Sequence, residues 1–209
     1  MPITVFPIGP LETNAFVAHE KQDAIIVDPG GDLRSGLTRI LDFLKQNTFT
    51  LQAVLLTHLH FDHVLGVAQL VQAFPGLKVY ASQQDDPILQ PSFGSGEWGM
   101  PPVSRFTYED ITPGKHSYGA VSLEVIPTPG HSEGSTSFYF PQDGAIIVGD
   151  LLFYRAVGRT DFPGGDFQKL VDSLRNHVYT LPPQTVAYPG HGPETVIGDE
   201  MRLNPFVRA

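Results

Sequence analysis

Apolar residues in the first 80 positions follow two different periods, which predict strands alternating with helices. Short apolar runs bounded by turn residues predict strands at 3–8, 14–20, 24–30, 51–58 and 77–82. Between the third and fourth strands a helical period predicts a helix with Asp32 as its N-cap. Its apolar face would carry Leu33, Leu37, Ile40, Leu41 and Leu44. A second helix is predicted at 64–74.

Strand patterns return in the second half of the chain, at 120–131, 135–140, 145–153 and 185–192. An amphipathic helix is predicted at 166–177, and a short helix ends near Asn204. The face of the 166–177 helix would carry Phe167, Leu170, Val171 and Leu174. Because strands and helices appear in each half, the pattern suits an α/β fold of two mixed sheets packed face to face with helices outside. We expect a single domain over residues 1–209.

Residues 82–106 lose this rhythm, since they combine glycines, prolines and aromatic residues without a period. Such a segment is either a lid over a binding site or an extended surface connection. On the first interpretation, Phe93, Trp98 and Met100 would line part of a pocket.

Composition excludes several kinds of protein. The formal charge of −9 argues against a nucleic-acid binder, which needs a basic face. The absence of cysteine removes disulfides, thiol catalysis and sulfur-ligated metals. No apolar run approaches the roughly 20 residues that span a bilayer. The start MPITVFPIGP lacks the features of a signal peptide, so we expect a cytoplasmic protein.

The stretch THLHFDHVLG at 57–66 concentrates residues that bind metals. In an extended segment His58 and His60 point the same way and can hold one ion together. A turn at Phe61 would aim Asp62 and His63 at a second point nearby. The alternative is a solvated loop or helix start with scattered histidines.

Three later positions follow apolar strands and lie beside glycine: His131 in TPGHSEGS, Asp150 in IIVGDLLF and His191 in AYPGHGPE. Each alone is weak, because Pro-Gly pairs often mark only turns. Together with the first stretch they make five histidines and two aspartates at predicted strand ends. These ligands suit two divalent ions, with Zn as the first candidate and Fe or Mn as alternatives.

In this order, THLHFDH with His131, Asp150 and His191 resembles the metallo-β-lactamase superfamily. The stretches TPGHSEGS, GDLLFYRAVGRTDFPGGD and PGHGPETVIGDEMRLNPF resemble the short, single-domain bacterial branch of glyoxalase II, the hydroxyacylglutathione hydrolases. The resemblance covers essentially the whole chain. It implies an αββα sandwich with the metals at one edge of the sheets.

The resemblance also implies roles for individual residues. One ion would be held by His58, His60 and His131, a second by Asp62, His63 and His191, and Asp150 would bridge them. Asp28 would support the histidine loop from behind. Ser132 departs from the family, where many members have threonine, but it keeps the hydroxyl.

The activity implied is hydrolysis of hydroxyacyl thioesters such as S-D-lactoylglutathione, a step of methylglyoxal detoxification, by a metal-bridging hydroxide. Asp62 and Asp150 are the candidate catalytic residues. Arg159 would bind substrate, or would be a surface arginine paired with Asp161 or Asp166. The chain ends soon after the last motif, so the C-terminal helical substrate domain of larger glyoxalases II is expected to be absent.

Other functions remain open on the same scaffold. One is a persulfide dioxygenase with a single iron, another is hydrolysis of lactones or β-lactams, and a third is a non-catalytic metal-binding module. The expected partner is a small thioester, with a glutathione conjugate as the first candidate, and neither nucleic acid nor a membrane. No sequence pattern predicts the acyl group, the thiol carrier or the oligomeric state.

Overall fold

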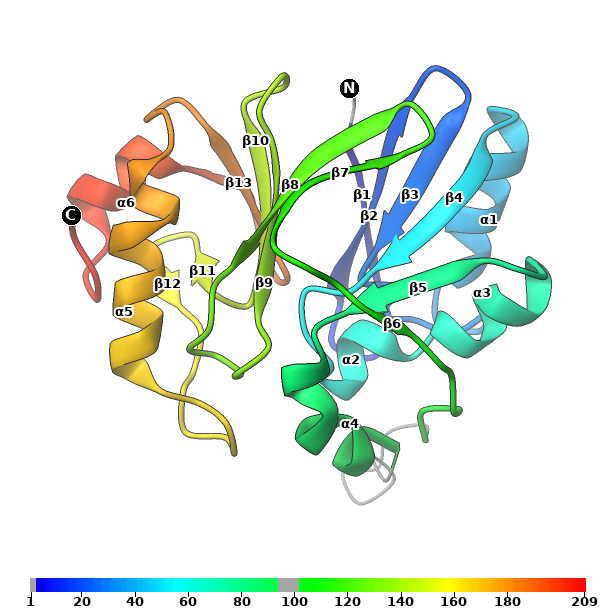
Figure 1. The fold of residues 1–209 in the computed structure, drawn as a ribbon, viewed down its shortest axis with the longest axis horizontal. Helices are drawn as coiled ribbons and strands as arrows, with labels where there is room; N and C mark the ends of the chain where they lie inside the picture. Colours follow the sequence, from blue (N-terminus) through cyan, green and yellow to red (C-terminus); the bar gives the residue numbers. More distant parts are fainter. Residues whose placement is uncertain (1–2, 94–101) are drawn as a thin grey trace.

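The computed structural model describes residues 3–93 and 102–209, except for the side chains of 91–93. Two six-stranded sheets face each other, and helices cover the outer face of each sheet (Figure 1). The fold is therefore the αββα sandwich of two mixed sheets that the resemblance implied.

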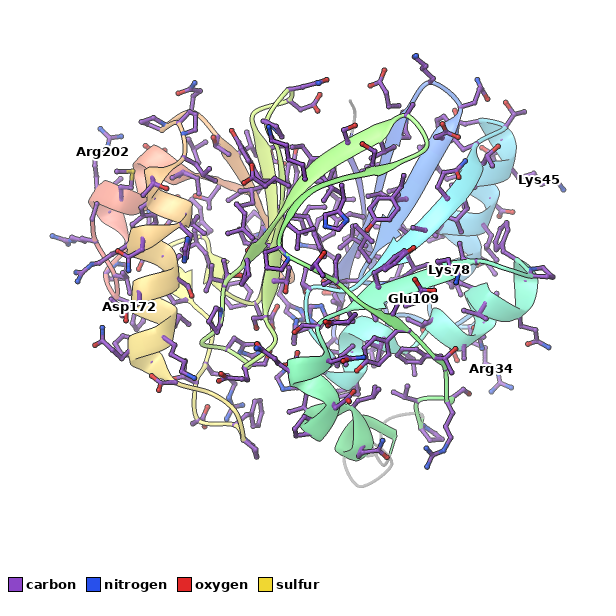
Figure 2. The ribbon with its side chains drawn as sticks, viewed as in Figure 1. Arg34, Lys45, Lys78, Glu109, Asp172 and Arg202 are labelled. Atoms are coloured by element: carbon purple, nitrogen blue, oxygen red, sulfur yellow. The ribbon has the colours of Figure 1, made fainter. Side chains whose placement is uncertain are left out.

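The first sheet has the strand order β1-β2-β3-β4-β5-β6. Its strands are β1 (Ile3–Ile8), β2 (Thr13–Glu20), β3 (Asp23–Val27), β4 (Thr50–Leu55), β5 (Lys78–Ala81) and β6 (Glu109–Asp110). The first three strands are antiparallel, and β3 to β6 are parallel. Lys78 and Glu109 form an ion pair between β5 and β6 (Figure 2).

The second sheet has the strand order β14-β13-β10-β9-β8-β7. Its strands are β7 (Gly114–Tyr118), β8 (Val121–Pro127), β9 (Thr136–Phe140), β10 (Ala145–Gly149), β13 (Val186–Pro189) and β14 (Thr195–Val196). Only β10 and β13 are parallel neighbours. A small hairpin of β11 (Leu152–Phe153) and β12 (Ala156–Val157) follows β10.

Helices lie on both outer faces of the sandwich (Figure 1). The first sheet is covered by α1 (Leu37–Gln46), α2 (Phe61–Val64) and α3 (Val67–Ala73). The second is covered by α5 (Phe167–Asn176), η3 (Val178–Thr180) and α6 (Ile197–Leu203). Between β5 and β6 lie η1 (Gln83–Asp85) and α4 (Asp86–Phe93).

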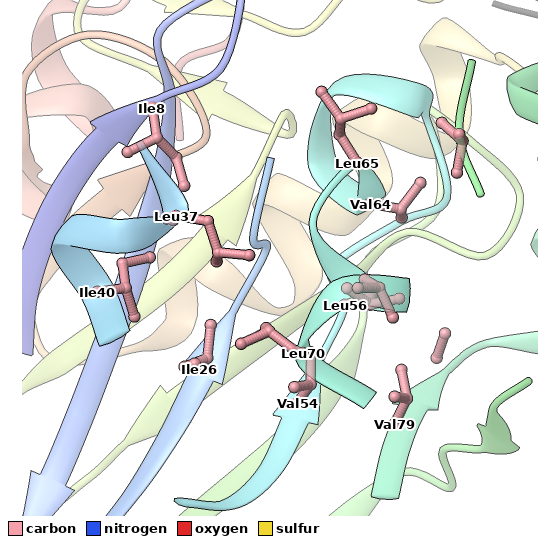
Figure 3. Close-up of a cluster of buried hydrophobic side chains, with 14 of the residues drawn as sticks. Ile8, Ile26, Leu37, Ile40, Val54, Leu56, Val64, Leu65, Leu70 and Val79 are labelled. Carbon is pink, nitrogen blue, oxygen red and sulfur yellow. The ribbon is translucent and has the colours of Figure 1, made fainter. Parts of the chain in front are cut away.

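The core has three layers because the central strands are buried on both faces. Along β2, Phe16 faces the other sheet whereas Val17 faces the helices, as the alternation of side chains in a strand requires. Figure 3 shows Ile26 and Val54 of the first sheet near Leu70 of α3. Both sheets are therefore held rigidly, and their edges provide fixed positions for a site.

Two details of the predicted helices were wrong. Helix α1 begins at Leu37 after Gly36, not after Asp32. The carboxylate of Asp32 instead accepts hydrogen bonds from the backbone of Arg34 and Ser35, in a local turn that competes with the helix and leaves Leu33 46% exposed. In α5, Asp166 is the N-cap, but Phe167 is 49% exposed while the other three apolar residues are buried.

The predicted irregular segment at 82–106 was also partly wrong, since η1 and α4 occupy its first half. Pro87 lies in the first turn of α4, where a missing N–H costs nothing. Trp98, Met100 and the side chain of Phe93 lie outside the described residues. The predicted helix at 64–74 divides into α2 and α3 at Gly66. Within 3–93 and 102–209, no helix has the length and apolar character needed to span a bilayer.

Candidate metal centre

The predicted ligands meet at one edge of the sandwich because the strands before them share a direction. In the second sheet, β8, β10 and β13 run the same way, and they lead into His131, Asp150 and His191. In the first sheet, β4 leads into His58. Residues distant in sequence are thereby brought into one cluster.

The first set of donors consists of His58, His60 and His131, whose ligand atoms lie within 4.8 Å of one another. His60 Nδ1 lies 2.9 Å from His131 Nε2. His58 and His131 are buried, and His60 is half-buried. The set therefore opens toward solvent on the side of His60.

The second set consists of Asp62, His63 and His191, within the same 4.8 Å limit. Asp62 and His63 lie in the single turn of α2, whose start at Phe61 provides the predicted change of direction. Asp62 Oδ2 lies 3.6 Å from His63 Nε2 and 3.2 Å from His191 Nε2.

Asp150 lies between the two sets. Its Oδ1 is 3.4 Å from His63 Nε2, and its Oδ2 is 3.7 Å from His131 Nε2 and 3.7 Å from His191 Nε2. Asp150 therefore contacts both sets. Its Oδ1 faces the second set, and its Oδ2 lies equally far from one ring of each set, which suits a ligand shared between them.

The donor atoms fit bound cations. Among the described residues, Nε2 of His58, Nε2 of His63 and Oδ1 of Asp150 are buried and make no hydrogen bond. Buried polar atoms normally make hydrogen bonds, so three buried atoms without one are suited to binding a cation. With metal–nitrogen bonds of about 2.0–2.1 Å, tetrahedral ligand atoms stand about 3.3 Å apart. The individual distances given above, from 2.9 Å to 3.7 Å, are close to that value.

Asp28 holds two of the imidazoles from behind. Its Oδ2 accepts hydrogen bonds from His63 Nδ1 (2.9 Å) and from the Thr57 hydroxyl (2.6 Å). The Thr57 oxygen in turn lies 3.0 Å from His58 Nδ1. Because Nδ1 of each ring donates to an oxygen, Nε2 is the nitrogen that would bind a cation. Asp28 thus contacts the ring of His63 directly and that of His58 through Thr57.

Sequence reasoning missed three further supports. The Thr13 hydroxyl donates to Asp62 Oδ2, and Asn14 donates to the carbonyls of Pro189 and Gly192 on either side of His191. Asp85 is bonded to both loops of the first set. A polar pair opening β2 and an aspartate after β5 were visible in the sequence, but their partners were not.

Gly190 leaves the space that the centre needs. A Cβ atom there would lie 2.1 Å from Asp150 Oδ1 and 2.7 Å from His63 Cε1. Only glycine therefore allows the β13 loop to approach the ligands this closely.

Charge divides the two sets. Burial lowers the pKa of His60 to about 4, assisted by His131, so this ring is neutral at pH 7. Burial also acts to lower the pKa of His63, but the carboxylates of Asp62 and Asp150 outweigh it and raise that pKa well above 6.5. Burial opposes ionisation of Asp62, yet the rings of His63, His191 and His60 together outweigh it and hold the pKa of Asp62 below its usual range. The carboxylates around the second set thus favour a positive charge at this position, which a bound cation would also supply.

The mouth of the site is bordered by Arg159 and Phe162. The Arg159 carbonyl accepts a hydrogen bond from His131 Nδ1, so this loop is fixed to the first set. Its guanidinium is paired with Asp161 at 2.6 and 2.7 Å and lies 3.8 Å from the centre of the Phe162 ring. The Phe162 ring is 5.6 Å from that of His60. The arginine predicted to bind substrate is near the centre but already has a carboxylate partner.

Comparison with known proteins gives a consistent result. The family described as Metallo-beta-lactamase superfamily matches residues 8–191. Hydroxyacylglutathione hydrolase GloC of Haemophilus influenzae is 30% identical over 100% of this chain and 99% of its own length. BLEG-1 B3 metallo-beta-lactamase superimposes with a TM-score of 0.90 at 36% identity over 100% of both chains. TTHA1623, solved in a di-iron-bound form, gives a TM-score of 0.87 at 36% identity over 98% of this chain and 100% of its own.

Proposed function

The chain belongs to the metallo-beta-lactamase superfamily, and on that premise we propose that it is a dinuclear metal-dependent hydrolase of hydroxyacyl thioesters such as S-D-lactoylglutathione. The observation that carries the proposal is the position of Asp150 between the two sets, with Oδ2 at 3.7 Å from His131 Nε2 of the first set and at 3.7 Å from His191 Nε2 of the second. Complete donors on both sides support two ions over the single iron of a dioxygenase.

Each residue has a defined part in the proposal. His58, His60 and His131 would hold one cation, and Asp62, His63 and His191 the other, with Asp150 shared. Two such ions lower the pKa of water toward about 7 and polarise a carbonyl oxygen. Asp62 is ionised and faces the centre, so it would hold the second cation and would orient an attacking water by accepting a hydrogen bond from it.

A thioester suits a site of this kind because its leaving group is a thiol with a pKa near about 8.5. The thiolate departs without a general acid. Among the described residues, the polar groups at the centre belong to the two sets of ligands or support them. The proposal therefore assigns none of them as a general acid. Arg159, released from Asp161, would bind a carboxylate of the thiol carrier.

Zn is the first candidate for both ions, since imidazole and carboxylate ligands suit it, and Fe or Mn are alternatives. The di-iron form of TTHA1623, a protein 36% identical to this chain, supports Fe as an alternative. We propose that residues 1–209 form a single domain.

A second candidate is β-lactam hydrolysis, which the similarity to BLEG-1 favours. The same metal-loaded preparation should therefore be assayed with S-D-lactoylglutathione and with a chromogenic cephalosporin. The proposal expects kcat/KM to be at least about tenfold higher for the thioester, and Asp150→Ala to abolish that rate. A higher value for the cephalosporin would replace the thioester by the β-lactam as the substrate class.

A further inference from the structure

Asp85, the last residue of η1, is a buried carboxylate with a relative exposure of 1%. It receives three hydrogen bonds from outside its own element. Leu59 N and Ser132 Oγ donate to its Oδ2 at 3.1 and 2.9 Å, and Gly134 N donates to its Oδ1 at 2.6 Å.

These three donors belong to the two loops that carry the first set of ligands. Leu59 lies between His58 and His60, and Ser132 directly follows His131. The first loop comes from the first sheet and the second from the other sheet. The carboxylate of Asp85 therefore connects the two sheets at the point where their ligands meet.

The fit around Asp85 is tight. A Cβ atom on Gly134 would lie 2.7 Å from both Cγ and Oδ1 of Asp85, so a glycine is needed for the approach. Ser132 is fully buried, and its hydroxyl also lies 2.7 Å from Ser135 Oγ. Neither loop can shift toward or away from the other without breaking a buried hydrogen bond.

The second set has different supports, in Asp28 behind His63, Thr13 beside Asp62 and Asn14 around His191. Within the first set, the side chains of His58 and His131 are oriented by Thr57 and by the Arg159 carbonyl. These contacts fix the rings, but they do not fix the distance between the two loops. Asp85 sets that distance at Leu59, Ser132 and Gly134, and the hydrogen bond from Thr136 N to the Thr57 carbonyl (2.8 Å) sets it beside His58.

We propose that Asp85 is a positioning residue for the first set of ligands. Its carboxylate holds the His58–His60 loop against the His131 loop at the spacing that one cation requires. The inference rests on the proposed metal centre. Asp85 contacts neither substrate nor metal in this proposal. It acts only through the backbone N–H groups of Leu59 and Gly134 and the hydroxyl of Ser132.

The test is Asp85→Asn, which keeps the size of the side chain but replaces one acceptor oxygen by a donor. The Ser132 hydroxyl can rotate to accept from the new amide, whereas a backbone N–H cannot. Either Leu59 or Gly134 therefore loses its partner. In the metal-free variant, hydrogen exchange should become faster at one of these two amides and should not change in β10.

Metal affinity is then measured without substrate, by titrating Co(II) into metal-free protein against a competing chelator and following visible absorption. The variant His191→Ala identifies which equivalent belongs to the second set. Loss of a supporting partner of this kind costs about 10- to 100-fold in metal affinity. Asp85→Asn should weaken binding of the Co(II) ion at the first set by that factor. Affinity for the ion at the second set should stay within about twofold of that of the natural protein.

Glu200→Gln is the matched control, because Glu200 is also a fully buried carboxylate with hydroxyl, amide and guanidinium donors. The partners of Glu200 lie away from the first set. The Glu200→Gln variant should therefore bind the Co(II) ion at the first set as tightly as the natural protein does. If Asp85→Asn does not fold, Ser132→Ala removes one of the three contacts and should weaken the same equivalent less.

The inference is overturned if Asp85→Asn binds both Co(II) ions as tightly as the natural protein does. It is also overturned if Glu200→Gln weakens Co(II) binding at the first set as much as Asp85→Asn does. The first result would leave the proposed function intact. If the natural protein binds no Co(II), the proposed function and this inference both fail.

Discussion

Asp28→Asn is the substitution that best separates ligand orientation from folding. Asp28 has a φ of 50°, a left-handed conformation that asparagine tolerates well, so the backbone should not change. One acceptor oxygen can still receive the Thr57 N–H, now 2.8 Å from Oδ1. The new amide group then faces His63 Nδ1, so Nδ1 loses its proton and the neutral ring keeps a proton only on Nε2.

That proton lies where a cation would bind, so the substitution opposes metal binding at the second set directly. Loss of such an orienting partner costs about 10- to 100-fold in affinity, or about 1.4–2.7 kcal/mol. The metal-free protein also loses a buried hydrogen bond to a charged group, which lowers its free energy of unfolding by about 1.5–3 kcal/mol.

Calorimetric Zn titration of the metal-free protein measures the first quantity, and urea unfolding measures the second. Asp32→Asn is the control, because Asp32 also accepts three hydrogen bonds but lies in a turn away from the site. Its Zn affinity should equal that of the natural protein. If Asp28→Asn retains full affinity for both ions, Asp28 does not set the orientation of His63.

Three further outcomes follow from the same geometry. Gly190→Ala places a Cβ 2.1 Å from Asp150 Oδ1, and the displacement of that carboxylate should lower kcat about 100-fold in the thioester assay; unchanged kcat would contradict the packing argument. Asp161→Asn removes the partner of Arg159, so KM for an anionic glutathione thioester should fall by up to about fivefold while kcat stays constant, whereas an increase in KM would show that the aspartate itself assists binding. Removing the ions with a chelator should lower the thermal midpoint by about 5–10 °C, because ligands that bind only the folded state at about 100 times Kd add about 2.7 kcal/mol; an unchanged midpoint in differential scanning calorimetry would argue against specific metal binding.

The sequence predicted the elements whose pattern is local. The strand leading to His58 is a continuous apolar run because β4 is covered on both faces, and such runs identify buried strands. The candidate ligands were visible because imidazole and carboxylate groups follow several of those strands, and because their order resembles a known family.

The features that the sequence did not reveal depend on partners distant in the chain. Asp85 looked like one acidic residue in an irregular segment, and only the fold brings it to Ser132 and Gly134. Asp32 is of a residue type that often caps helices. However, the Ser35 hydroxyl donates to its carboxylate and accepts from its backbone N–H, which forms a local turn instead. The hairpin of β7 and β8 was half missed, since β7 lies at the sheet edge and alternates polar with half-buried residues.

The central claim is that two cations, shared through Asp150, hydrolyse a thioester. The most direct test is the rate of S-D-lactoylglutathione hydrolysis as Zn is added stepwise to the metal-free protein. The account predicts that the rate rises until two equivalents are bound, and that Asp150→Ala shows no rate above the uncatalysed reaction at any loading. A rate that is already maximal at one equivalent, or that survives in Asp150→Ala, would contradict it.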